Sequence, residues 1–319
     1  MKTASIALCA LALALPIHAE QWPTAPVRVV VNAAAGGVAD RAMRVLVPLL
    51  SEKLGKQFIV DNKAGGEGYI GQQEVARAKP DGQTFLFSAG TMVVVTPQLV
   101  PRADFDPRKA LTPVVPTVGI PMNLLVHPSL PVQSAAELIN YAKANPERLN
   151  FGSAGSGTAL HIAAETFNRA AGIKMKHVPY KGAGEALKDF LGGHIEVLFD
   201  PGLAAQNVKA GNAKLLAVAG SARNPQFPNV PTMDELGIKG VDGGPYFGIY
   251  APKGVSPEIV QRMNDAVTSA LATPEVRQQL SNMNLEIAPS MAPAQFGSYL
   301  QKESDRYAKL LPDLGIKPQ

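Results

Sequence analysis

The chain has 319 residues, 46% of them hydrophobic, and a formal net charge of +4 at pH 7. This length and apolar content suit one large or two ordinary α/β domains with real cores, and they exclude a disordered chain. The mild positive charge is spread without basic runs, which argues against a nucleic-acid partner and is compatible with a small anionic ligand.

Residues 1–19 have the pattern of a cleavable secretory signal. Lys2 supplies the positive end, residues 6–15 form an apolar run, and residues 17–19 form a cleavage site. The run is too short to span a bilayer, and no later stretch approaches the roughly 20 apolar residues that a span needs. We therefore expect a periplasmic protein. Removal of the signal also removes the single cysteine, Cys9, so we expect neither a disulfide nor a thiol nucleophile.

The first part of the chain alternates strand and helix patterns. Buried-strand patterns occupy Val27–Val31, Phe58–Asp61 and Thr84–Ser88. Helical spacing of apolar residues covers Val38–Leu54, which ends at Gly55, and Ile70–Ala78. The proline-rich stretch 97–118 is expected to be irregular.

Two loops of this first part carry candidate ligand contacts. The first strand runs into a small-residue loop, and the third strand ends in hydroxyl side chains; the candidates are Ala35, Gly36, Gly37, Asp40, Ser88 and Thr91. Asp40 falls in the first turn of a helix, where a carboxylate either complements the helix dipole or contacts a ligand. Ser88 and Thr91 are placed for a ligand between domains, or they act as ordinary caps.

The stretch Gly66–Gly71 formally matches the dinucleotide-binding fingerprint. No acidic residue follows about 20 positions later to bind a ribose hydroxyl. We therefore expect a tight turn here and no nucleotide cofactor.

A second domain is expected to begin near residue 119. Strand patterns cover 123–127, 149–151, 175–179, 195–199 and 215–219, and helical patterns cover 135–144, 159–171 and 185–191. A proline-bearing connection at 225–231 is expected to lead back to the first domain. There the chain continues with a strand at 247–251 and helices at 257–271, 274–283 and 293–311. These patterns predict domain 1 from 20–118 and 226–319, domain 2 from 119–225, and largely parallel sheets flanked by helices.

The stretch Gly152–Thr158 is a small-residue loop between a predicted strand and a predicted helix. Its three glycines permit backbone angles closed to other residues and leave the main-chain N–H groups accessible to an anion. Ser156 or Thr158 is expected to cap the helix that follows, whose positive dipole end would face the same ligand. The candidate contacts here are Ser153, Ala154, Gly155, Ser156, Gly157, Thr158 and His161. Helical periodicity assigns His161, Glu165 and Asn168 to the polar face, and a merely flexible loop is the alternative interpretation.

Several motifs in this order resemble one family. They are Trp22-Pro23, Ala35-Gly36-Gly37 with Asp40, Pro80-Asp81-Gly82, Gly152–Thr158 with His161, Val178–Gly182, Gly192-Gly193-His194 running to Phe199-Asp200, and Val230-Pro231-Thr232. Together they resemble the Bug (TctC) family, the extracytoplasmic solute receptors of tripartite tricarboxylate transporters, over essentially the whole mature chain.

The resemblance implies a two-domain α/β fold of the type II periplasmic-binding-protein class, with a ligand cleft between the domains. It implies a monomer that delivers a small carboxylate to the membrane components of a transporter. One loop from each domain, 33–38 and 153–158, would hold the carboxylate through main-chain groups. The chain departs from the family where Asn32-Ala33 replaces Pro-Phe or Pro-Tyr and Val38 replaces a smaller or polar residue. These departures predict a roomier or more apolar cleft.

Contacts to the body of the ligand are expected from Tyr180, Lys181, Asp200, Tyr246 and Phe247, for which packing or surface roles are the alternative.

Two other functions compete with transport. A sensor that reports to a membrane signalling protein would use the same cleft. A secreted serine hydrolase would draw on Ser156, His161 and Asp200, but Ala154 and Thr158 occupy the glycine positions that flank a nucleophile elbow. No cluster has metal-ligand spacing. We therefore expect a binding protein rather than an enzyme, without a metal or cofactor.

Overall fold

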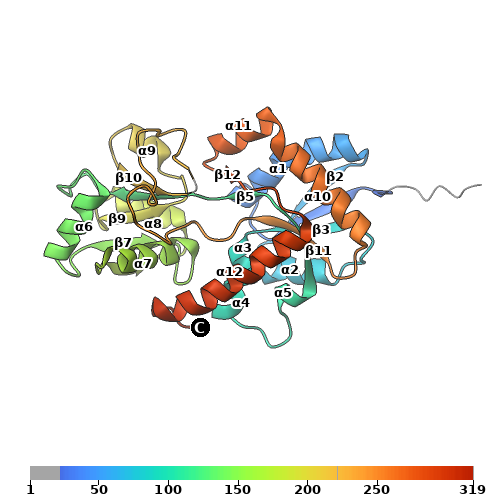
Figure 1. The fold of residues 1–319 in the computed structure, drawn as a ribbon, viewed down its shortest axis with the longest axis horizontal. Coiled ribbons are helices and arrows are strands. Elements are labelled where there is room, and N and C mark those ends of the chain that lie inside the picture. Colours follow the sequence, from blue (N-terminus) through green and yellow to red (C-terminus); the bar gives the residue numbers. More distant parts are fainter. Residues whose placement is uncertain (1–21, 221, 319) are drawn as a thin grey trace, which may run out of the picture.

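The computed structural model describes residues 22–220 and 222–318, so the expected signal at residues 1–19 lies outside the described residues. Two lobes lie side by side, and the long helix α12 (Pro293–Asp313) crosses their junction (Figure 1). Within the described ranges, no helix combines the length and apolarity that a membrane span requires.

The first lobe is built on a five-stranded sheet with the order β2-β1-β3-β11-β4. The strands are β1 (Val27–Val31), β2 (Phe58–Asn62), β3 (Thr84–Ser88), β4 (Leu111–Pro116) and β11 (Gly248–Pro252). β1 pairs in parallel with β2 and β3, whereas β11 pairs antiparallel with both β3 and β4. Four strands therefore run in one direction, and β11 alone runs in the other.

The second lobe repeats this arrangement with the order β10-β6-β9-β7-β8. The strands are β6 (Met122–Val126), β7 (Asn150–Ser153), β8 (Lys176–Pro179), β9 (Val197–Asp200) and β10 (Lys214–Ala219). β6 pairs antiparallel with β9 and β10, and β7 pairs in parallel with β8 and β9. In each sheet the reversed strand is the one that enters after the chain crosses from the other lobe. The expected pair of α/β domains with largely parallel sheets is confirmed.

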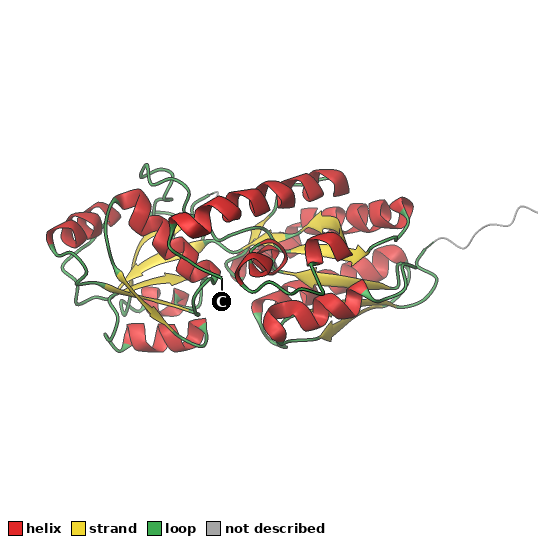
Figure 2. Ribbon diagram, turned by 90° about the horizontal axis from the view of Figure 1, so that it is seen from below, coloured by secondary structure: helices red, strands yellow, loops and turns green. Residues whose placement is uncertain are grey.

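Helices cover both faces of each sheet (Figure 2). Those of the first lobe are α1 (Val38–Leu54), α2 (Tyr69–Ala76), α3 (Gly90–Val94), α4 (Thr96–Leu99), α5 (Pro107–Ala110), α10 (Pro257–Ala272), α11 (Pro274–Asn282) and the 3₁₀ turn η1 (Gly66–Gly68). Those of the second lobe are α6 (Ala135–Ala144), α7 (Ala159–Ala171), α8 (Ala183–Leu191) and α9 (Ala205–Lys209).

The strands of the first sheet are buried on both faces. Val27, Val29 and Val31 of β1 belong to the core cluster under α1 and α10, whereas Val30 belongs to the cluster on the opposite face. A strand that is apolar on both faces reads as a continuous hydrophobic run. This is why β1 is recognisable from the sequence.

The expectation of an irregular stretch at 97–118 is wrong in part. Residues 111–116 form β4, although Pro113 and Pro116 lie within it. β4 is an edge strand, where a missing N–H donor is tolerated because one side of the strand has no partner. The short helices α3, α4 and α5 were also not expected.

The two segments that cross between the lobes lie against each other. The Phe247 N–H donates to Val118 O and the Thr117 N–H donates to Phe247 O, both at 2.8 Å. The short strand β5 (Val118–Gly119) also pairs antiparallel with β12 (Glu286–Ile287). Met233, Ile238 and Val241, which lie beyond residue 226, are buried in the core of the second lobe. We therefore propose crossings at about residue 119 and at residues 242–247, with the second later than the sequence suggests.

Candidate functional site

A cavity of about 590 Å³ lies between the lobes. The first lobe contributes Glu67, Thr91, Met92, Val95, Thr96, Leu99 and Val100, and the second contributes residues 154–159 and Lys181. One wall is therefore largely apolar, and the other is the glycine-rich loop at the start of α7. A loop and a helix N-terminus facing a cavity form an arrangement suited to an anion.

The loop 153–158 turns sharply at two glycines. Gly155 has a φ of +119° and Gly157 a φ of +77°, angles that L side chains rarely adopt. The Gly155 N–H donates to Ser153 Oγ at 3.1 Å, while Thr158 donates to Gly155 O through both its N–H at 3.3 Å and its hydroxyl at 2.7 Å. The expected side-chain cap of α7 by Ser156 or Thr158 is thus wrong, since the Thr158 hydroxyl faces back into the loop.

His161 takes the place of that cap. Its Nδ1 accepts from the Gly157 N–H at 3.0 Å, and the side chain is buried with only 7% of the residue exposed. Asn168 is also buried, because its amide bonds the main chain of Met175. The helix face to which His161 and Asn168 were assigned as polar residues is therefore buried at both positions.

Some main-chain N–H groups of this loop stay available. Ser156 and Ala159 line the cavity, and within the described part of the chain their N–H groups have no hydrogen-bond partner. The N–H groups of Gly155 and Gly157, by contrast, are already bonded inside the loop. These unpaired donors belong to residues at the N-terminus of α7, the positive end of its dipole, and both residues line the cavity.

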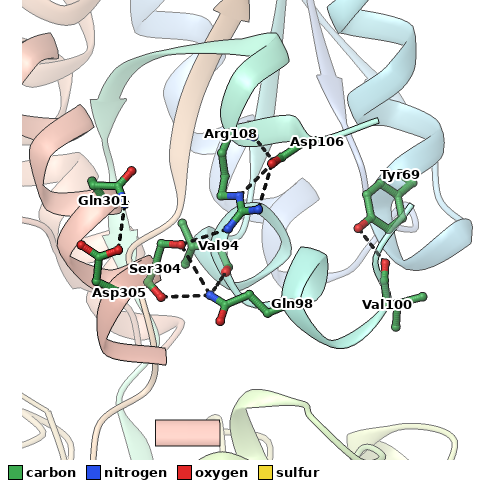
Figure 3. A network of polar contacts seen from close by, with 9 residues as sticks. All are labelled: Tyr69, Val94, Gln98, Val100, Asp106, Arg108, Gln301, Ser304 and Asp305. Carbon is green, nitrogen blue, oxygen red and sulfur yellow. Dashed lines mark hydrogen bonds and ion pairs between the residues drawn. The ribbon is translucent and has the colours of Figure 1, made fainter. Parts of the chain in front are cut away.

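The opposite wall is held from behind by a polar network that connects α3, α4 and α5 to α12 (Figure 3). Gln98 Nε2 donates to Val94 O at 2.7 Å and to Ser304 O at 3.0 Å, and Arg108 Nη1 donates to Ser304 Oγ at 3.2 Å. Arg108 also forms an ion pair with Asp106 at 2.8 Å. The short helices that present Met92, Val95 and Leu99 are therefore anchored to a long helix.

The loop 33–38 of the first domain is braced internally. The Gly36 N–H donates to Asp40 Oδ2 at 2.8 Å, and Arg44 Nε donates to Asp40 Oδ1 at 2.9 Å. Burial raises the pKa of Asp40, but the hydrogen bonds from Arg44, Gly36 and Asn62 outweigh it and leave the pKa below its usual range. Both oxygens of Asp40 are thus occupied. Ala35, Gly36 and Gly37 do not line the 590 Å³ cavity.

Of the remaining candidate contacts, only Thr91 and Lys181 line that cavity. Ser88 is fully buried, where it accepts from Asn32 Nδ2 at 2.9 Å and donates to Ala89 O at 3.2 Å. The Tyr180 hydroxyl donates to Asp189 Oδ2 at 2.9 Å, and burial together with that carboxylate raises the pKa of Tyr180 to about 12.

Two aromatic candidates lie at the crossing segments instead. Phe247 packs on Phe87 with ring centroids 5.8 Å apart. Tyr246 lines a separate cavity of about 310 Å³ together with Tyr299 and Arg306. Phe247 and Tyr246 therefore lie at the junction of the lobes and not in the 590 Å³ cavity.

Asp200 serves a turn and not the cavity. It is 1% exposed, and its carboxylate accepts from the N–H groups of Gly202, Leu203 and Ala204 at 2.8, 3.1 and 3.1 Å. Asp200 is therefore not placed to act as the acid of a serine hydrolase. His161 is not placed to act as its base either, because its Nδ1 already accepts from the Gly157 N–H of the loop. The described residues also contain no group of three or more His, Cys, Asp or Glu side chains that could hold a metal ion.

The sequence interpretation missed His177 and the apolar wall. His177 stands opposite Phe151 only through the register of β7 and β8, which no local pattern reveals. Met92, Val95 and Leu99 do have helical spacing, and this signal could have identified the helical stretch around Pro97.

A pH prediction follows from the burial of His161. Burial and the neighbouring His177 lower the pKa of His161 to about 4, from about 6.5 in an unfolded chain. Well above pH 6.5 the imidazole is neutral in both the folded and the unfolded state. As the pH falls toward 4, the unfolded chain takes up a proton that the folded protein does not. The free energy of unfolding should therefore fall by about 2 kcal/mol between pH 7 and pH 5 on account of His161.

Urea denaturation at both pH values measures this loss. His161→Asn, which does not titrate, should show a pH-dependent loss smaller by that amount. Equal losses in the two proteins would contradict the prediction.

The chain matches the family model described as "Tripartite tricarboxylate transporter family receptor", TctC, over residues 42–316. Among solved structures it is similar to Rpa4515 of R. palustris with adipate, at 30% sequence identity and a TM-score of 0.80, covering 93% of this chain and 100% of that one. It is similar to the periplasmic binding protein BugD at 30% identity and a TM-score of 0.76, covering 93% and 100%. It is similar to MatC of Rhodopseudomonas palustris with bound malate at 28% identity and a TM-score of 0.73, covering 91% and 100%.

Proposed function

The chain belongs to the TctC family of tripartite tricarboxylate transporter receptors, and on that premise we propose that it captures a small dicarboxylate between its domains and delivers it to the membrane components of such a transporter. The family is one of solute-binding receptors and not of enzymes. The two-domain periplasmic-binding-protein fold expected from the sequence is confirmed by the match to BugD.

The free N–H groups of Ser156 and Ala159 at the start of α7 carry the proposal. Both residues line a cavity whose other wall comes from the first domain, so a ligand there contacts both domains at once. A ligand that contacts both halves favours the closed arrangement over the open one. Rpa4515 with adipate and MatC with malate support a ligand of this class.

Lys181 is our candidate partner for a second carboxylate. Its side chain lines the cavity and, among the described residues, forms no ion pair. The other charged residue that lines the cavity is Glu67 in η1, on the side of the first domain. A chain with a carboxylate at each end can therefore place one end at α7 and the other at Lys181, with its methylene groups against Met92, Val95 and Leu99.

The periplasmic location is proposed from the signal pattern of residues 1–19 and from the periplasmic relative BugD. The alternative is that the protein presents the bound ligand to a membrane sensor instead of a transporter, and it would use the same cleft for this.

Ligands of matched length test this proposal. Adipate, hexanoate and 6-aminohexanoate share a six-carbon chain and differ at one end, and glucose serves as a neutral sugar. We expect adipate to raise the melting temperature by about 5 °C or more at 100 times its Kd. Hexanoate should bind more weakly because it leaves Lys181 unpaired, and Lys181→Met should weaken adipate binding and leave hexanoate binding unchanged. Stabilisation by glucose alone would contradict the proposal. Stronger binding of 6-aminohexanoate would instead identify Glu67 as the partner of an amine.

A further inference from the structure

Two histidines support the loop 153–158 from the side that faces the protein interior. His161 Nδ1 accepts from the Gly157 N–H at 3.0 Å, and His177 Nε2 lies 2.6 Å from Ser153 Oγ. The Ser153 hydroxyl in turn reaches both the N–H and the carbonyl of Gly155, at 3.1 and 3.0 Å. Every residue with a positive φ in the loop is therefore tied, directly or through Ser153, to an imidazole.

The two imidazoles form one stacked unit. Their ring centroids are 3.9 Å apart at an interplanar angle of 17°, and the ring of Phe151 lies beside both, with its centroid 5.0 Å from that of His177 and 6.2 Å from that of His161. The three rings come from β7, β8 and the first turn of α7.

The contacts require the neutral form of His161. A protonated imidazole carries a hydrogen on both nitrogens and would present a donor to the Gly157 N–H, so the neutral ring must keep its proton on Nε2. Nε2 lies 3.9 Å from Glu165 Oε1. The Ser153 hydroxyl has a single hydrogen, which it donates to Gly155 O, so His177 Nε2 carries the proton that the hydroxyl accepts. Burial of both rings disfavours the charged forms.

We propose that His161 and His177 are positioning residues of the carboxylate grip. As a neutral stacked pair they engage the inward-facing groups of Ser153, Gly155 and Gly157, which leaves the N–H groups of Ser156 and Ala159 free for the ligand. This inference rests on the proposed function, because it takes a carboxylate at the start of α7 as the ligand.

Isosteric variants separate this role from simple packing. Asn places Oδ1 where His161 has Nδ1, and Gln places its terminal amide where His177 has Nε2, whereas Leu fills the space without a polar atom. We expect His161→Leu and His177→Leu to lose at least tenfold in adipate affinity by calorimetry. His161→Asn and His177→Gln should remain within about threefold of the wild type. His194→Leu, at a side chain that is 73% exposed, is the control for losing a histidine.

Amide hydrogen exchange measures the protection of the loop amides directly, and it needs no ligand. The Gly157 amide should be protected in the wild type and in His161→Asn, and should exchange faster in His161→Leu. Adipate should add protection at Ser156 and Ala159.

Leu variants that bind adipate as the wild type does, or Asn and Gln variants that lose as much as Leu, would overturn the inference. A wild-type protein that binds neither adipate nor malate would instead overturn the proposed function, and the ligand part of this inference with it.

Discussion

Replacing Gly157 with alanine is expected to lower the affinity for adipate at least tenfold. Gly157 has a φ of +77°, and a Cβ atom added there would overlap Leu99 Cδ1 of the first domain. Leu99 would have to move, and this contact is made across the cleft, so the substitution hinders approach of the two domains around the ligand. Calorimetric titration with adipate measures the loss.

Gly172 provides a matched control at the other end of α7. Its φ is +64°, and a Cβ atom there would meet nothing within 4 Å. Gly157→Ala and Gly172→Ala should therefore lose similar stability, about 1–2 kcal/mol each for a left-handed alanine, but only the first should lose affinity. Leu99→Ala added to Gly157→Ala should recover part of the binding.

Equal affinities in the two glycine variants would show that the contact between Gly157 and Leu99 does not control closure. Ser156→Ala completes the set. It keeps the main-chain N–H, so its affinity should change little if main-chain donors hold the carboxylate.

Asp200→Ala is expected to lower the free energy of unfolding by about 4 kcal/mol and to leave adipate affinity unchanged. The carboxylate is buried and accepts from three main-chain N–H groups of the turn after β9. The Ala204 donor is buried and the Gly202 and Leu203 donors are partly buried; a buried donor left without a partner costs about 1–3 kcal/mol, and a partly buried one costs less. Chemical denaturation and calorimetry measure the two quantities separately.

Asp200→Asn tests the same point with less disruption. It retains one oxygen acceptor, so its loss of stability should be clearly smaller than that of Asp200→Ala. If Asp200→Asn lost adipate affinity with unchanged stability, Asp200 would be a ligand contact, as the sequence interpretation proposed.

The local sequence pattern was sufficient to predict the bounds of helices and strands that have clear start and stop residues. The sequence predicts Val27–Val31, Val38–Leu54, Thr84–Ser88 and Ala135–Ala144 with the bounds that the structure has. These segments are either apolar on both faces or amphipathic with a clear period, and they end at glycine or polar residues. Alternation of such elements, together with the motif order, also predicted the family.

Pattern failed where two tendencies conflict within a few residues. Proline argues against a strand, yet Leu111–Pro116 is one, because an edge position needs donors on one side only. Helical periodicity assigned His161 to the polar face. Its ring is nevertheless buried, since the turn at Gly157 and the ring of His177 supply the partners that a buried imidazole requires.

By itself, then, the sequence determined the two α/β domains, the glycine-rich loop before α7 and the receptor family, because these depend on residue types and spacings along the chain. Tertiary structure alone decided which N–H groups remain free, that Asp200 closes a turn, and that Leu99 faces Gly157 across the cleft. The approach of Leu99 to Gly157 joins segments that are far apart in the chain, whereas the turn at Asp200 and the bonds inside the loop join residues two to four positions apart whose backbone angles are set only in the folded protein. The physical reason is that a polar group contacts a ligand only when the fold leaves it unpaired, and pairing is decided in three dimensions.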